Sequence, residues 1–283
     1  MKLKSEEMYK EVIEAIKSTR VKKPLIECLT NTVTINDCAN IILASGSSPI
    51  MAEDKREVEE VVSFSSALLI NIGTLQKESV EAMLKAGKKA NEIGIPVIFD
   101  PVGVGATTLR NEASKQIISE IKLAVIRGNM SEIRALSGFT ASTKGVDVGD
   151  CDIVNKDNLE HSVSIVQNLA KNLNCVVAAT GAIDIVASQN GAYIIENGHS
   201  MLADITGTGC MCSAVVAAFC GGSDNYCATT IAGIISMGIA GEKAYEFVAK
   251  GDCGIGTFRV KMMDYIYTLS EKDILEMGKI YEA

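Results

Sequence analysis

The fold class follows from the apolar run Ala67-Leu68-Leu69-Ile70-Asn71-Ile72-Gly73, which carries no charge and ends at an asparagine and a glycine. Beyond it lies a helical pattern, with Val80, Met83 and Leu84 at i, i+3 and i+4 and Gly87 next on that face. Comparable, largely apolar runs recur at residues 25–30, 96–100, 123–127 and 175–180. Apolar strands that alternate with amphipathic helices predict an α/β protein with a mostly parallel sheet covered on both faces.

Other segments extend this pattern. Apolar positions at helical spacing predict a helix over residues 5–19, and a second helix is expected from about residue 32 to residue 44. Two short strands flank Gln189-Asn190-Gly191, which predicts a β-hairpin at an antiparallel edge of the sheet. The chain shows no internal repeat and no linker, so residues 1–283 are expected to form a single domain.

The composition excludes several classes of protein. The chain has 27 Lys and Arg against 35 Asp and Glu, a formal net charge of −8, whereas nucleic-acid binding needs a basic face. Its 9 cysteines include no C-x-x-C pair and it has only 2 histidines, too few for a Cys/His zinc site. The first residues lack the apolar core of a signal peptide. We therefore expect a cytoplasmic protein with reduced thiols, most of them buried as small apolar side chains.

One stretch requires comparison with a membrane span. Residues 225–241 carry no charge, but they include three glycines and several hydroxyl groups. A spanning helix needs about 20 strongly apolar residues, and this stretch is shorter. It is expected to form a buried helix of the core, and no membrane partner is expected.

Polar residues stand at the ends of several expected strands. Asn71, Asp100, Arg127 and Thr180 are the clearest examples. Parallel strands present their carboxyl ends at one edge of the sheet, and ligands bind at that edge. The pattern therefore indicates a functional site there.

The most informative loop is Thr206-Gly207-Thr208-Gly209-Cys210, which leads directly into an uncharged helical segment. Glycines permit positive φ and close approach of a ligand, and the amides at a helix start favour an anion such as a phosphoryl group. The loop matches neither G-x-G-x-x-G nor G-x-x-x-x-G-K-[ST]. Taken alone, it is explained equally well by tight packing of a strand against a helix. The polar strand ends favour a ligand site.

Four segments together resemble the hydroxyethylthiazole kinase family. They are Pro49-Ile50-Met51-Ala52-Glu53, Asp100-Pro101-Val102-Gly103, Arg127-Gly128-Asn129-Met130-Ser131-Glu132-Ile133 and Thr206-Gly207-Thr208-Gly209-Cys210, in that family's order and spacing. The resemblance implies a three-layer α/β/α ribokinase-like fold. It also implies ATP- and Mg²⁺-dependent phosphorylation of the hydroxyl of 4-methyl-5-(2-hydroxyethyl)thiazole for thiamine synthesis. A homotrimer with the thiazole site between subunits is implied in the same way.

The resemblance assigns roles residue by residue. It implies that Met51 and Gly207 bind the thiazole, that Arg127, Thr180 and Asn129 bind ATP, and that Asp100 and Glu132 position Mg²⁺. Three of these have plainer structural alternatives. Met51 can be a core methionine, Arg127 can form a surface salt bridge, and Glu132 can be a first-turn acid favoured by the helix dipole.

Cys210 stands where related ribokinase-like kinases carry an aspartate base. The resemblance places it beside the substrate hydroxyl, in a catalytic loop with Gly207, Thr208 and Gly209, whose amides would stabilise developing charge. A thiol at a helix start is expected to have a lowered pKa, so we expect Cys210 to orient or deprotonate that hydroxyl. Cys212 lies about 200° away around the helix and is expected in the core.

One segment and one further residue have no functional role in this interpretation. Gly254-Ile255-Gly256 departs from the Gly-Pro-Gly turn of the family, and this turn is expected to be structural. His199 is expected at the surface or rim of the site.

Three alternative functions are weighed against this one. A kinase of hydroxymethylpyrimidine is disfavoured by Cys210 and by the segment around Met51. A lyase of related fold, which repairs hydrated nicotinamide cofactors, would need an aspartate in the glycine-rich loop. A thiazole- or nucleotide-binding protein without catalysis is disfavoured by Asp100, Arg127 and Glu132.

Overall fold

One mostly parallel sheet runs through the part of the chain that this computed structural model describes, residues 5–140 and 154–283. The strand order is β2-β1-β3-β4-β5-β6-β7-β8-β9. Strands β1 to β6 are parallel, and β7, β8 and β9 continue the sheet in antiparallel orientation. The strand bounds are β1 Leu25–Leu29, β2 Ser48–Ile50, β3 Ala67–Asn71, β4 Val97–Asp100, β5 Val125–Asn129, β6 Val176–Thr180, β7 Asp184–Ala187, β8 Ala192–Ile195 and β9 Ile280–Glu282. The predicted sheet and hairpin are confirmed.

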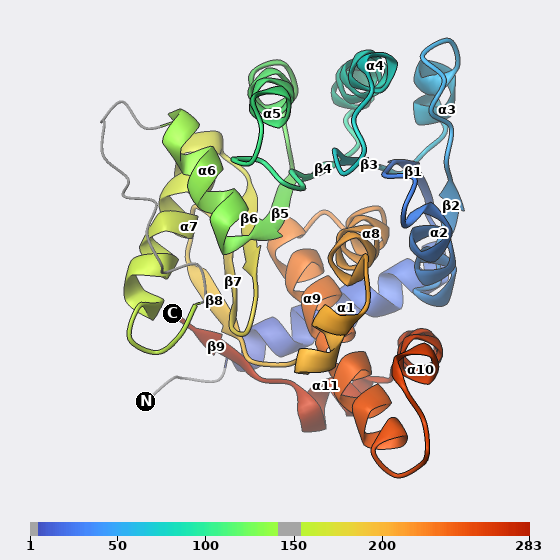
Figure 1. The fold of residues 1–283 in the computed structure, drawn as a ribbon, viewed down its shortest axis with the longest axis vertical. Helices are drawn as coiled ribbons and strands as arrows, with labels where there is room; N and C mark the ends of the chain where they lie inside the picture. Colours follow the sequence, from blue (N-terminus) through green and yellow to red (C-terminus); the bar gives the residue numbers. More distant parts are fainter. Residues whose placement is uncertain (1–4, 141–153) are drawn as a thin grey trace.

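Helices cover both faces of this sheet (Figure 1). Their bounds are α1 Glu6–Lys22, α2 Ile35–Ala44, α3 Val58–Ser63, α4 Lys77–Ile93, α5 Thr108–Glu120, α6 Met130–Thr140, α7 Leu159–Leu173, the 3₁₀ helix η1 Ser200–Asp204, α8 Thr208–Cys220, α9 Tyr226–Val248, α10 Ile255–Tyr267 and α11 Glu271–Met277. One apolar cluster joins the sheet to α1, α2 and α8 to α11, and a second joins its other face to α3 to α7. The predicted three-layer α/β/α arrangement is confirmed.

The central strands are largely apolar because both of their faces are buried. Leu69 and Ile98 pack in the cluster with α8 and α9, whereas Leu68 and Phe99 pack in the cluster with α4 and α5. Successive residues of a strand point to opposite faces, so a strand between two helical layers needs apolar residues at every position.

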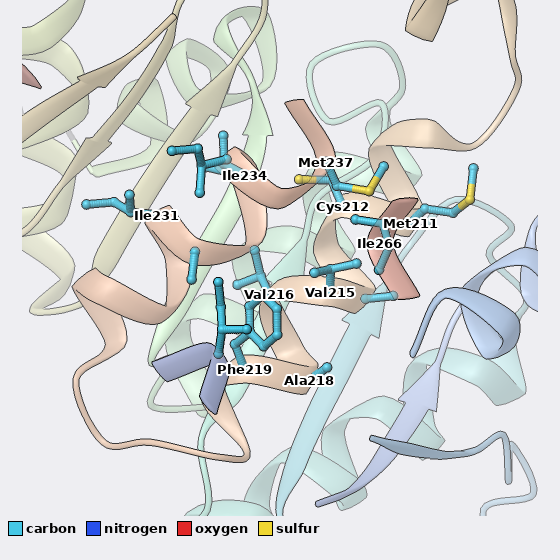
Figure 2. Close-up of a cluster of buried hydrophobic side chains, with 14 of the residues drawn as sticks. Met211, Cys212, Val215, Val216, Ala218, Phe219, Ile231, Ile234, Met237 and Ile266 are labelled. Carbon is cyan, nitrogen blue, oxygen red and sulfur yellow. The ribbon is translucent and has the colours of Figure 1, made fainter. Parts of the chain in front are cut away.

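Side chains of helices α8 and α9 pack together in the first of these two apolar clusters (Figure 2). They approach closely because Gly233 has no side chain, since a β-carbon there would lie 2.5 Å from Val216 Cγ2. Cys212 lies in this cluster at 6% exposure, which confirms its predicted core position. None of the helices in the described ranges combines the length and apolar character that crossing a bilayer requires. Asn225 caps α9 and residues 226–241 lie within this helix, mostly buried, as predicted.

Two helix boundaries could not be predicted correctly from apolar spacing, namely the start of α2 and the end of α4. The helix expected from residue 32 begins at Ile35, because Asn31 Oδ1 accepts the Thr34 backbone N–H at 3.1 Å and holds the intervening residues in a turn. Helix α4 continues past Gly87, where the missing side chain leaves room for Ile121. A β-carbon on Gly87 would lie 2.3 Å from Ile121 Cδ1.

Three further features concern strand β9, the start of α10 and His199. Strand β9, of three residues, was not predicted because it is too short to show a pattern. Gly254 precedes α10, and Ile255 and Gly256 are the first residues of that helix, so this segment forms a helix start where a turn was predicted. His199 is half-buried and stacks on Tyr245, with ring centroids 3.6 Å apart.

The described cysteines are free thiols, and most are buried, as predicted. The buried ones are Cys28, Cys38, Cys175, Cys212 and Cys220. Cys151 and residues 1–4 lie outside the described residues. Within the described ranges, no group of three or more His, Cys, Asp or Glu side chains is arranged to hold a metal ion.

Candidate active site

The polar strand ends meet the start of α8 at the carboxyl edge of the sheet. Asp100 ends β4, Arg127 lies in β5 and Thr180 ends β6. Asp100 accepts a hydrogen bond from Ser213 of α8, and Arg127 lies against Gly209 of the same helix. The structure therefore brings the sequence-predicted strand ends to the glycine-rich loop.

The loop turns sharply into α8. Gly207 has φ +85°, the left-handed region that favours glycine, and its carbonyl accepts the Met211 N–H at 2.8 Å. Thr208 begins the helix, but its hydroxyl donates to the Leu202 carbonyl at 2.9 Å. Thr208 therefore offers its backbone amide to a ligand, while its side chain anchors the loop to η1.

Arg127 is held beside this helix start. One guanidinium nitrogen donates to Thr180 Oγ1, and another lies 2.9 Å from where a β-carbon on Gly209 would stand. Its Nε is buried without a hydrogen-bond partner among the described residues. Arg127 therefore contacts Thr180 and Gly209 at the carboxyl edge of the sheet. These contacts do not support the alternative that Arg127 forms a surface salt bridge. A donor fork at a helix start is suited to phosphate oxygens.

Asp184 of β7 joins this cluster. Its Oδ1 accepts the Gly181 backbone N–H at 2.8 Å and so fixes the turn that follows Thr180. Burial raises the pKa of the Asp184 carboxyl to about 7, and the Gly181 hydrogen bond and the charge of Arg127 oppose that effect. Asp184 thus supports the turn after Thr180 and faces the charge of Arg127, two of the three residues predicted to bind ATP, without being an exposed ligand itself.

Asp100 presents one oxygen to the site. Its Oδ2 accepts hydrogen bonds from Ser213 Oγ at 2.7 Å and Asn71 Nδ2 at 2.9 Å, whereas its buried Oδ1 has no partner among the described residues. Burial raises the pKa of the Asp100 carboxyl to about 6, with Arg127 opposing this and Glu132 adding to it. An orphaned buried carboxylate oxygen needs a cation or a donor, which a ligand can supply.

Glu132 has a defined local role in the first turn of α6. Its Oε2 accepts the Asn129 backbone N–H at 2.7 Å, and Asn129 Oδ1 accepts the Glu132 N–H at 2.9 Å. Its Oε1 accepts the Gly103 N–H at 2.8 Å. These contacts agree with the alternative in which Glu132 is an acidic residue that stabilises the first turn of a helix. Each carboxylate oxygen still has a lone pair available for a further donor or a cation.

Cys210 lies at the start of α8 but is not a thiol of lowered pKa. Burial raises its pKa, and the charge of Asp100 raises it further, against hydrogen bonds from Asn71, Thr34 and Asn31. The prediction of a lowered pKa is wrong because desolvation destabilises the thiolate more than the helix start stabilises it. Cys210 therefore faces the site as a neutral thiol near pH 7.

Met51 follows the edge strand β2. Its side chain is half-buried against the same apolar cluster that Cys210 borders, so the core alternative and a ligand contact are both compatible with its position. The buried Glu27 of β1 accepts the backbone N–H of Ala52, in the loop after β2, at 3.1 Å. Burial raises the pKa of the Glu27 carboxyl to about 8.

Several residues of the site were not selected from the sequence. Asn31, Ser213, Asp184 and Arg110 are the main ones. Arg110 donates to the Ile72 carbonyl at 2.6 Å and the Gly73 carbonyl at 2.8 Å, which holds the loop after β3. Ser213 was detectable in principle, because it lies three residues after Cys210 and therefore on the same face of α8. Asn31 and Asp184 had no signal beyond being polar near a strand end, and Arg110, which lies on α5, had none.

The chain has a ribokinase-like fold. A ribokinase-like superfamily protein from Enterococcus faecalis superposes with a TM-score of 0.61 at 9% identity, covering 89% of each chain, which shows the fold alone. The structure of a hydroxyethylthiazole kinase protein from Pyrococcus horikoshii superposes with a TM-score of 0.86 at 38% identity, covering 97% of this chain and 99% of that one.

The sequence comparisons identify the family. The model of the hydroxyethylthiazole kinase family matches residues 16–272. The hydroxyethylthiazole kinase of Clostridium tetani is 49% identical over 277 residues, which cover 98% of this chain and 100% of the relative. This chain belongs to the hydroxyethylthiazole kinase family.

Proposed function

We propose that this protein transfers the γ-phosphoryl group of ATP to the hydroxyl of 4-methyl-5-(2-hydroxyethyl)thiazole, as the names of its relatives imply. The observation that carries the proposal is the contact of Arg127 with Gly209 at the glycine-rich start of α8. A phosphoryl group placed there meets backbone amides and a guanidinium, the groups that stabilise charge in phosphoryl transfer. We take residues 1–283 as one kinase domain.

The nucleotide end of the site is assigned to Arg127, Thr180 and Asn129. Arg127 and Thr180 are joined by a hydrogen bond, so both can face the same phosphate. Asn129 caps α6 through its Oδ1 and lies exposed at the end of β5. The loop amides from Gly207 to Cys210 would hold the transferred group.

The acceptor end is assigned to Met51, Gly207 and Cys210. A thioether packs well against a flat sulfur heterocycle. The hydroxyl oxygen attacks the γ-phosphorus in line, the bond to the β,γ-bridging oxygen breaks, ADP leaves and the hydroxyl proton is released. A neutral Cys210 thiol would orient the hydroxyl, because transfer of this kind depends mainly on positioning and electrostatics.

Mg²⁺ is assigned to Asp100 and Glu132. The unpartnered Asp100 Oδ1 fits a cation, and Glu132 retains one lone pair on each oxygen. Mg²⁺ binds through few carboxylates plus waters and phosphates, so two acids suffice. When bound, the ion would neutralise charge on the triphosphate.

A homotrimer with the thiazole site between subunits is part of the proposal. The edge strand β2, which precedes Met51, is paired on one side only among the described strands. Large apolar side chains on or beside α2 and α3 are exposed, namely Val33 at 65%, Leu43 at 54% and Phe64 at 57%. A monomer by light scattering at micromolar concentration would contradict a shared site. We also infer a cytoplasmic location from the free thiols.

The test is an ADP-release assay with MgATP and each alcohol offered separately. Turnover with hydroxyethylthiazole alone is the expected result. Turnover with hydroxymethylpyrimidine instead would assign the other substrate. Thiazole binding by calorimetry without turnover would make the protein a binding protein. Removal of Mg²⁺ with EDTA should abolish turnover and restoring it should recover the rate.

A further inference from the structure

Two asparagine amides link the Cys210 thiol to Asp100. Asn31 Nδ2 donates to Cys210 Sγ at 3.1 Å and to Asn71 Oδ1 at 3.1 Å. Asn71 Nδ2 in turn donates to Asp100 Oδ2 at 2.9 Å. The chain therefore runs from the loop after β1, across the end of β3, to the end of β4.

The direction of this chain is fixed by backbone donors. The Thr34 backbone N–H donates to Asn31 Oδ1 at 3.1 Å, and the Gly73 backbone N–H donates to Asn71 Oδ1 at 2.9 Å. A backbone N–H can only donate, so each amide must turn its oxygen to that N–H and its nitrogen the other way. Neither amide can be flipped without losing a hydrogen bond.

Asn31 has no capacity left for a ligand. Its Oδ1 accepts from the Thr34 N–H and the Thr34 hydroxyl, and its two Nδ2 protons go to Asn71 and Cys210. The side chain is buried, with Asn31 4% exposed and Asn71 1% exposed. A saturated, buried amide orients its neighbours and does not itself bind substrate.

A second link closes the arrangement. Ser213 follows Cys210 by three residues on α8 and donates to Asp100 Oδ2 at 2.7 Å. Asp100 Oδ2 is thus occupied from two sides, which leaves the unpartnered Oδ1 for a ligand. At Cys210, the sulfur accepts a hydrogen bond from Asn31, and Asn71 and Thr34 also lie within hydrogen-bonding reach of the thiol.

We propose that Asn31 is a positioning residue of the kinase, which holds the Cys210 thiol toward the acceptor hydroxyl and, through Asn71, sets its place relative to Asp100. The inference rests on the proposed function. A thiol on a helix start can rotate about χ1, and a donor held by two other groups selects one rotamer. Loss of that donor misplaces the reacting groups, which costs rate more than binding.

The activity test compares Asn31→Asp with the wild type. The substitution keeps the shape and the oxygen that accepts from Thr34, but removes both donated protons. We expect kcat to fall roughly tenfold or more while KM for thiazole and for ATP changes less than about threefold. A rise in KM for the thiazole with kcat unchanged would overturn the proposal, because Asn31 would then bind substrate.

A double-mutant cycle tests whether Asn31 acts through the thiol. In a Cys210→Ala background there is no sulfur to place, so Asn31→Asp should cost at least about threefold less than in the wild type. The same loss in both backgrounds would contradict the inference. The control is Asn190→Asp, the same change in the exposed hairpin turn, with kcat unchanged. Thermal unfolding checks that each variant folds, and Asn31→Ser replaces Asn31→Asp if that variant does not.

A measurement without substrate separates this inference from the proposed function. The rate of iodoacetamide alkylation at Cys210 is followed by mass spectrometry of its peptide. A hydrogen-bond donor stabilises the thiolate and a carboxylate does not, so Asn31→Asp should react at least about threefold more slowly than wild type and Asn190→Asp. An unchanged or faster rate overturns the inference. Absence of thiazole turnover in the wild type would instead overturn the proposed function, and the alkylation rate would still decide the placement of Cys210.

Discussion

Gly207 lies directly against Thr34, so that a β-carbon on the glycine would stand 2.2 Å from Thr34 Cγ2. Thr34 is itself held by Asn31, through its backbone N–H at 3.1 Å and its hydroxyl at 3.0 Å. The glycine-rich loop and the turn after β1 are therefore packed as one unit. The glycine is required by this contact as well as by its φ of +85°.

This packing predicts the effect of Gly207→Ala. The left-handed conformation alone costs an alanine about 1–2 kcal/mol, and the overlap with Thr34 adds to it. We expect the free energy of unfolding to fall by about 2 kcal/mol or more and kcat to fall at least about tenfold. Denaturant unfolding and the ADP-release assay measure these changes. Gly191→Ala is the control, because no atom lies within 4 Å of its added β-carbon, and equal losses in the two variants would contradict the contact.

Arg127→Ala is expected to act on the nucleotide. The loss of the half-buried Arg127 guanidinium beside Thr180 and Gly209 should raise KM for ATP about tenfold or more, the usual effect of removing a charged hydrogen bond. KM for the thiazole should change less than about threefold. Steady-state kinetics with each substrate varied in turn distinguish the two. Equal effects on both KM values would argue against the assignment, and Lys171→Ala, an exposed cation on α7, should change neither.

Cys210→Ser tests the role of the thiol. A neutral Cys210 that orients the hydroxyl is replaced well by a serine hydroxyl, which also accepts from Asn31. We therefore expect kcat of Cys210→Ser to stay within about tenfold of wild type and Cys210→Ala to lose more, whereas loss of a general base costs roughly 10²–10⁴. A loss of that larger size in the serine variant would restore the base hypothesis.

The raised pKa of buried Glu27 predicts that the free energy of unfolding depends on pH. Its folded-state pKa of about 8 lies above the ordinary value of 4.5, so the folded protein holds this proton more tightly than the unfolded chain. The contribution is fully present below about pH 4.5 and is lost as pH rises to about 8. Glu27→Gln should remove this decline from urea unfolding curves measured between pH 5 and pH 8.5. The exposed Glu112→Gln should retain the wild-type slope, and an unchanged slope in Glu27→Gln would show that Glu27 is not the source.

The sequence alone was sufficient for the layers and for most of the polar carboxyl edge of the sheet. Apolar runs such as residues 67–71 and 97–99 need burial on both faces, and the chain connectivity then places Asp100, Arg127 and Thr180 at one edge. Helix boundaries were less accessible, since the start of α2 depends on the Asn31 side chain and not on apolar periodicity.

The protonation state of the Cys210 thiol could not be predicted from the neighbouring sequence. The helix start predicts a lowered pKa for Cys210, but burial and the nearby Asp100 raise it, and both effects come from residues distant along the chain. The same holds for Asp184 and Ser213, which reach the site from β7 and from the second turn of α8.

What this sequence determined by itself is the architecture, the family resemblance and the sheet edge at which the polar strand ends gather, because apolar periodicity and short motifs are local properties of the chain. Only the tertiary structure decided which polar groups share hydrogen bonds, which carboxylate oxygen stays open, and that Cys210 is neutral. Those properties depend on desolvation and on contacts between residues such as Asn31 and Cys210, which are 179 positions apart and meet only in the folded protein.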